Sequence, residues 1–112
     1  MAYGYATKTG DTARQVIDNL KLYGRPLDLT GAAVNFIMRK ADERGDVVLD
    51  QPAIVQNALK GTVTYRFIVG QTDKPGLYNC EWRVVFPTGR IVTVPDNDSV
   101  TLRIVKSVKA GQ

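Results

Sequence analysis

The sequence contains no histidine and only one cysteine, Cys80. The absence of histidine removes the commonest general base, the commonest metal ligand and every triad that depends on an imidazole. A single cysteine excludes an internal disulfide and a zinc site built from cysteines. We therefore expect no catalytic residues, no cofactor and no metal, and an enzyme is the least expected class of protein.

Long apolar runs are also absent, since no stretch approaches the length of a membrane span. The first residues, Met1 to Tyr5, lack the charged and apolar regions of a secretion signal. These absences predict a soluble protein that folds in a cytoplasm and has no membrane partner.

The formal net charge of +4 is basic, but lysine and arginine are scattered instead of gathered into one run. Nucleic-acid binding would favour a basic patch, often with interleaved aromatic residues, and would depend steeply on salt. We therefore favour a solvated surface and expect no nucleic-acid partner.

Acidic residues do gather in two polar segments, which could suggest a calcium site. They are Asp42, Glu43, Asp46 and Asp50, followed later by Asp96 and Asp98. Their spacing does not match a calcium-binding loop, and Asp favours turns for backbone reasons. Polar turns are therefore the stronger interpretation, and we predict no metal ligands.

The 112 residues suffice for one domain, and short segments of alternating apolar and polar residues predict strands within it. Residues 32–40 and 62–69 alternate clearly, whereas residues 11–22 also fit a helix and are assigned to a strand only because the rest is β-like. Residues 23–26, Tyr-Gly-Arg-Pro, indicate a turn. The pattern predicts an all-β fold: an antiparallel two-sheet immunoglobulin-like β-sandwich of about seven to eight strands over residues 12–105.

The fold is predicted to centre on a β-hairpin between Pro75 and Pro95, with a turn at residues 87–89. One face of its first strand carries alternating apolar residues that include the only tryptophan, Trp82. Tyr78 follows a Pro-Gly corner, where its hydroxyl can hydrogen-bond back to the preceding loop. Together with neighbouring strands, this face gives the predicted core: Val34, Phe36, Tyr65, Phe67, Tyr78, Cys80, Trp82 and Phe86.

The chain ends are predicted to lie outside the sandwich, as an N-terminal arm over residues 1–11 and a tail over residues 106–112. Tyrosine and arginine are common anchors at protein interfaces. We therefore take as interface candidates Tyr3, Tyr5, Arg103, Lys106 and Lys109.

Three stretches resemble a known family. They are Gly10-Asp11-Thr12, the segment 27–39 that begins Leu-Asp-Leu-Thr-Gly-Ala, and the segment 74–89 with Pro-Gly-Leu-Tyr-Asn-Cys-Glu-Trp and Phe-Pro-Thr-Gly; Val100-Thr101-Leu102 follows. In this order they resemble the immunoglobulin-like N-terminal domain of tailed-phage baseplate upper proteins and related virion proteins, over roughly residues 10–105.

The resemblance implies a structural protein of a phage particle, a tail or baseplate adaptor or a head- or neck-associated component. It would mount or cement neighbouring virion proteins, work as a symmetric oligomer, and reside in the virion. Longer members carry a fibre or receptor-binding part, which we do not expect after residue 105. The alternative is a carbohydrate- or cell-surface-binding module, which would expose Trp82 as a stacking platform; its place on the apolar face favours burial instead.

Overall fold

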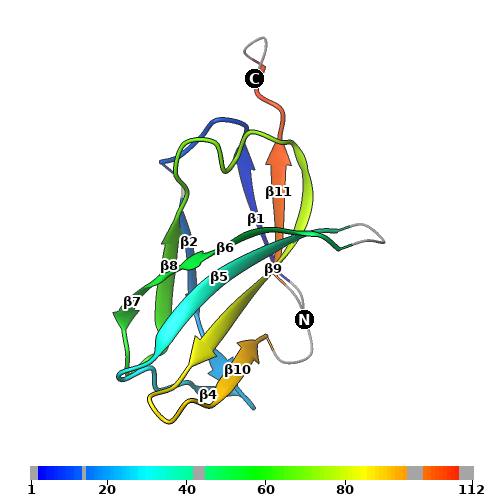
Figure 1. The fold of residues 1–112 in the computed structure, drawn as a ribbon. Coiled ribbons are helices and arrows are strands. Elements are labelled where there is room, and N and C mark those ends of the chain that lie inside the picture. The colour runs from blue at the N-terminus through cyan, green and yellow to red at the C-terminus, as the bar shows by residue number, and fades with distance from the viewer. Residues whose placement is uncertain (1–2, 14, 42–44, 96–99, 109–112) are drawn as a thin grey trace.

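The computed structural model describes residues 3–13, 15–41, 45–95 and 100–108. Their regular structure consists of strands, with no helix among these residues, so the predicted all-β sandwich is confirmed (Figure 1). Within the same residues, no helix has the length and apolar character needed to cross a membrane.

The larger sheet has β9 at its centre. In spatial order it contains β1 (Tyr3–Lys8), β11 (Val100–Val105), β9 (Gly76–Val85), β5 (Ala33–Lys40) and β6 (Val47–Pro52), with β10 (Ile91–Val94) also paired to β9. β5 pairs along one edge of β9, from Tyr78 to Val85. The other edge is shared, because β11 takes the first half of β9 and β10 takes the second half. The predicted hairpin is thus the β9–β10 pair, and it organises the sheet.

The smaller sheet packs its inner face against the larger one. It contains β2 (Gln15–Asn19), β8 (Thr62–Arg66) and β7 (Ile54–Asn57) in that order. A separate ribbon of two short strands, β3 (Lys21–Leu22) and β4 (Arg25–Pro26), extends from β2. These short strands and β1 raise the number of strands to eleven in the described residues, above the seven to eight expected.

Aromatic side chains fill the space between the sheets. The Phe36 ring lies 4.8 Å from that of Trp82 and 5.0 Å from that of Tyr65, measured between centroids. Phe67 packs edge-on against both Phe36 and Tyr65. Such pairs contribute about 0.5–1.5 kcal/mol each beyond their buried area. The Trp82 indole nitrogen donates to Asp18 across the sandwich, 3.2 Å away.

The residues expected in the core occupy these positions. Seven of them are buried: Val34, Phe36, Tyr65, Phe67, Tyr78, Cys80 and Trp82. Phe86 is only partly buried, because it lies just beyond the end of β9, where its amide donates to the Arg90 carbonyl across the turn.

The N-terminal segment differs from the expected arm, because Tyr3–Lys8 form β1 within the larger sheet. β1 runs parallel to β11, with Tyr5 opposite Leu102 and Thr7 opposite Ile104. Thr7 is buried and Tyr5 packs against the core, so the inward face of this strand consists of threonine and tyrosine. The inward and outward residues of β1 therefore differ little in hydrophobicity. This explains why the sequence indicates an arm and not a strand.

Candidate protein-interaction groove

The described residues contain few groups that could bind a metal or act in catalysis. They contain no group of three or more histidine, cysteine or carboxylate residues that could hold a metal ion. The single thiol, Cys80, is fully buried, and this burial raises its pKa to about 12. A buried neutral thiol is inert as a nucleophile. Of the acidic residues considered above, Asp42, Glu43, Asp96 and Asp98 lie outside the described residues.

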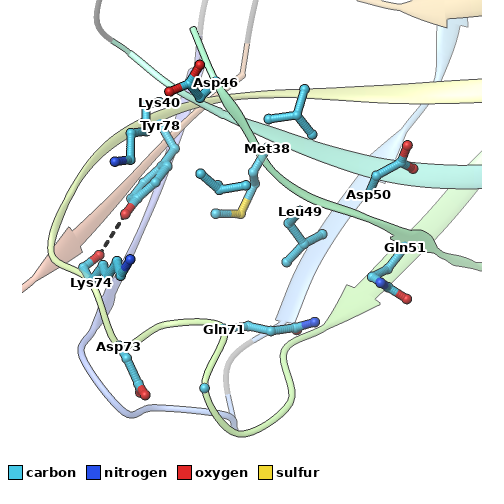
Figure 2. A pocket seen from close by; sticks show the side chains of 13 residues that line it. Met38, Lys40, Asp46, Leu49, Asp50, Gln51, Gln71, Asp73, Lys74 and Tyr78 are labelled. Carbon is cyan, nitrogen blue, oxygen red and sulfur yellow. Dashed lines mark hydrogen bonds between the residues drawn. The ribbon is translucent and has the colours of Figure 1, made fainter. Parts of the chain in front are cut away.

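A groove lies between β6 and the loop formed by residues 67–75. Its volume is about 750 Å³. Figure 2 shows Met38 and Leu49 at the floor, with Tyr78 at one end. All three side chains are at least nine-tenths buried. The floor is therefore apolar but almost closed to solvent, so the apolar surface that a partner would meet is mainly that of Val47 and Val48.

The loop that forms one wall of the groove is held by hydrogen bonds. The Tyr78 hydroxyl donates to the Lys74 carbonyl at 2.8 Å, which confirms the bond expected from the Pro-Gly corner (Figure 2). The Gln71 side-chain oxygen accepts from the Tyr65 hydroxyl at 2.8 Å and from the Ile68 amide at 2.9 Å. Burial raises the pKa of both tyrosines. The groove is thus preformed, because its wall is fixed at both ends of the loop.

Charged side chains surround the apolar floor. Asp46 comes from the β6 side and Asp73 from the loop side. The Asp50 carboxylate points away from Leu49 and accepts a hydrogen bond from the Asn35 side chain at 2.8 Å (Figure 2). Lys40 and Lys74 lie at opposite ends of the Tyr78 side chain, at one end of the groove (Figure 2). An apolar centre with a polar rim is the usual anatomy of a protein interface.

Exposed apolar residues line the groove on its β6 side, and two more come just before its loop wall in the sequence. On β6, Val47 and Val48 are 50% and 45% exposed, and in the loop Ile68 and Val69 are 64% and 89% exposed. Single exposed apolar residues are common, but Val47 and Val48 are adjacent and both line the groove, and exposed apolar patches mark interaction sites.

The open edge of β6 is poorly suited to adding a further strand. β6 lies at the end of the sheet order, paired only with β5. The Ala53 amide donates to the Val34 carbonyl, so by the alternation of an antiparallel ladder the backbone of Asp50 and Pro52 faces outward. Pro52 has no amide hydrogen, and a register shift opposite Arg39 leaves Val48 without a partner in the ladder. Proline and bulges are devices that block edge pairing, so the groove is better suited to an inserted side chain than to a strand.

The interface candidates chosen from the sequence do not gather at this groove. Arg103 is exposed on the outer face of the larger sheet, opposite Leu77, and Lys106 is exposed beyond β11. Tyr5 points inward, where its hydroxyl donates to the Ile17 carbonyl of β2 and where burial, followed by the nearby Asp18 charge, raises its pKa to about 12. The Tyr3 side chain and Lys109 lie outside the described residues.

The groove residues were missed, although the sequence held one signal. Val47-Val48 is an adjacent apolar pair that interrupts the alternation, so both members of the pair cannot face one core.

Comparison with known proteins identifies the family. None of the curated proteins matches the chain. Among solved structures, the crystal structure of CopC from Methylosinus trichosporium OB3b aligns with 91% of this chain and 83% of its own, at 15% identity and a TM-score of 0.48. The BppU N-terminal domain family matches residues 5–108. This family is one of phage baseplate structural domains and not of enzymes, and it implies association with the virion and contact with other virion proteins. The chain therefore belongs to the family of baseplate upper protein N-terminal domains.

Proposed function

We propose that this domain is an adaptor that mounts neighbouring subunits in a phage baseplate, and that the groove between β6 and the loop 67–75 is where a neighbouring subunit docks. The observation that carries the proposal is the coincidence of a preformed apolar floor with two exposed valines and a charged rim in a baseplate structural domain. Such a site receives an anchoring side chain and surrounds it with polar contacts.

The groove also fits the role because it requires no rearrangement. The hydrogen bonds of Tyr78 and Gln71 fix the loop before a partner arrives. A preformed site avoids the cost of ordering a loop on binding, so a groove of this kind can support stable assembly.

The carbohydrate-binding alternative loses its main support. The proposed stacking platform, Trp82, is 0% exposed and donates its indole hydrogen to Asp18. A sugar could reach the ring only if the core opened, so we favour protein contacts.

The test is incorporation of variants into baseplates assembled by co-expression with the other baseplate proteins of the same phage. Val48→Glu places a charge at the groove, on a side chain that is 45% exposed. The matched control is Val105→Glu on β11, where the valine is 42% exposed and is not among the residues that line the groove. We expect Val48→Glu to reduce incorporation about tenfold or more, as at a binding hot spot, whereas Val105→Glu is incorporated like the wild type. Equal incorporation of both variants, with both folded, would refute the assignment of the groove.

A further inference from the structure

Strand β1 adds little apolar surface to the core, so its main contribution to the fold is a backbone ladder. Its described inward side chains are those of Tyr5 and Thr7, and the buried Thr7 hydroxyl has no hydrogen-bond partner among the described residues. A buried hydroxyl without a partner is unfavourable. Six residue pairs nevertheless join β1 to β11. Pairing, more than burial, therefore holds β1 at the edge of the larger sheet.

The parallel direction of this pair determines how it meets a pulling force. β1 and β11 run side by side in the same direction, with Tyr3 opposite Val100 at one end and Lys8 opposite Val105 at the other (Figure 1). Tension that enters through the backbone before Tyr3 and leaves through the backbone after Val105 therefore acts at opposite ends of the ladder. The strands are then pulled past each other, and their hydrogen bonds are loaded together. In an antiparallel pair the same two positions would lie at one end, and the pairs would separate one at a time.

The backbone groups of the ladder can be assigned from the bonds at its end. The Thr9 amide donates to the Val105 carbonyl at 2.9 Å, and the Ser107 amide donates to the Thr9 hydroxyl at 2.9 Å. Backbone groups alternate in direction along a strand, so the amide and carbonyl of Arg103 also face β1, while the residues between them face β9. β11 is thus bonded to a neighbouring strand on each side.

Two further features oppose movement of β1 along β11. A shift by one residue would turn Tyr5 and Thr7 outward, because side chains alternate between the faces of a sheet. It would also break the hydrogen bond from the Tyr5 hydroxyl to the Ile17 carbonyl. Beyond β1, the Asp11 carbonyl accepts from the buried Thr72 hydroxyl at 2.9 Å, which ties the connection to the body of the domain. Slipping in register and swinging outward are therefore both opposed.

We propose that β1 and β11 form a mechanical clamp, with which the domain carries tension between the parts of the baseplate that it joins. A domain that mounts its neighbours lies in the path of any force between them, and loading along an in-register parallel ladder is the direction in which this pair resists best. The inference rests on the adaptor role proposed above, but not on the position of the docking groove.

The measurement is single-molecule force spectroscopy of the isolated domain with two kinds of attachment. Handles fused to the two ends of the chain load the clamp along the strands. Handles on the cysteines introduced by Lys8→Cys and Lys106→Cys, two exposed positions at one end of the ladder, peel the strands apart. Cys80 is fully buried and stays unlabelled. At equal loading rate, we expect the first rupture to need about twofold or more force along the strands than in peeling.

Two variants, pulled by their chain ends, separate the clamp from overall stability. Arg103→Pro removes an amide that faces β1, at a residue with an exposed side chain. Tyr78→Phe removes a hydroxyl that bonds the Lys74 carbonyl, outside the clamp. Both should lower the melting temperature, but we expect only Arg103→Pro to lower the rupture force, by about twofold.

Equal rupture forces for the two attachments would overturn the inference, and so would a wild-type force for folded Arg103→Pro. The comparison of attachments leaves the ladder backbone unchanged, so it decides the question if Arg103→Pro does not fold. Val48→Glu should keep the wild-type rupture force. If Val48→Glu also enters baseplates normally, the groove assignment fails and the clamp stands.

Discussion

Gly61 is a position where the structure predicts a large effect of adding one methyl group. Its φ is +72°, and a Cβ there would lie 2.6 Å from the Leu20 carbonyl oxygen and 2.8 Å from that of Leu27. Both atoms are backbone, so they cannot rotate away. Gly24 is a matched control, because its φ is +78° and a Cβ there would meet nothing within 4 Å.

The two substitutions to alanine therefore differ mainly in the steric term. Gly24→Ala introduces only the positive-φ cost, about 1 kcal/mol. Gly61→Ala adds the displacement of a backbone junction whose hydrogen bonds join Leu20 to Gly61 and Leu27 to Leu20. Loss of two such bonds costs about 1 kcal/mol each, so the free energy of unfolding should fall by about 3 kcal/mol in total.

The assay is thermal unfolding followed by circular dichroism. At roughly 4 °C per kcal/mol for a domain of this size, we expect the melting temperature to fall by about 4 °C for Gly24→Ala and about 12 °C for Gly61→Ala. Equal shifts for the two variants would refute the close approach of the ribbon base to Gly61.

Two further predictions concern stability. Tyr78→Phe removes the hydroxyl that donates to the Lys74 carbonyl, so the free energy of unfolding should fall by about 1 kcal/mol and the melting temperature by about 4 °C. An unchanged melting temperature would contradict a role for this bond in holding the loop. Stability should also decline as pH rises above about 9, the ordinary thiol pKa, because the unfolded chain loses the Cys80 proton first while burial keeps the folded thiol protonated towards pH 12. Below pH 9 this contribution to stability is fully present. Between pH 8 and 11, the melting temperature of the Cys80→Ala variant should decline less steeply than that of the wild type; an identical decline would show that Cys80 is not responsible.

The sequence predicted the centre of the fold because the information there is local. The alternation around Trp82 places a whole strand face in the core, and the Pro-Gly corner before Tyr78 fixes a bond to a residue four positions away. Strand β1 was not predicted, because its place depends on parallel pairing with β11 at the other end of the chain and its inward residues are weakly apolar.

The groove could not be predicted for a similar reason. It exists because the loop 67–75 lies across from β6, and that relation between distant segments leaves no periodic pattern in the sequence. The Tyr23-Gly24 turn was indicated by its residues, but the exposure of Tyr23 and its positive φ come from the ribbon geometry.

Photocrosslinking in an assembled baseplate tests the central claim most directly. A photoreactive amino acid at position 48 lies at the groove, and one at position 105 serves as the comparison. Docking at the groove predicts that position 48 forms a crosslink to a neighbouring subunit in high yield and that position 105 does so far less. Crosslinks from position 105 with none from position 48 would contradict the claim that neighbouring subunits are mounted through this groove.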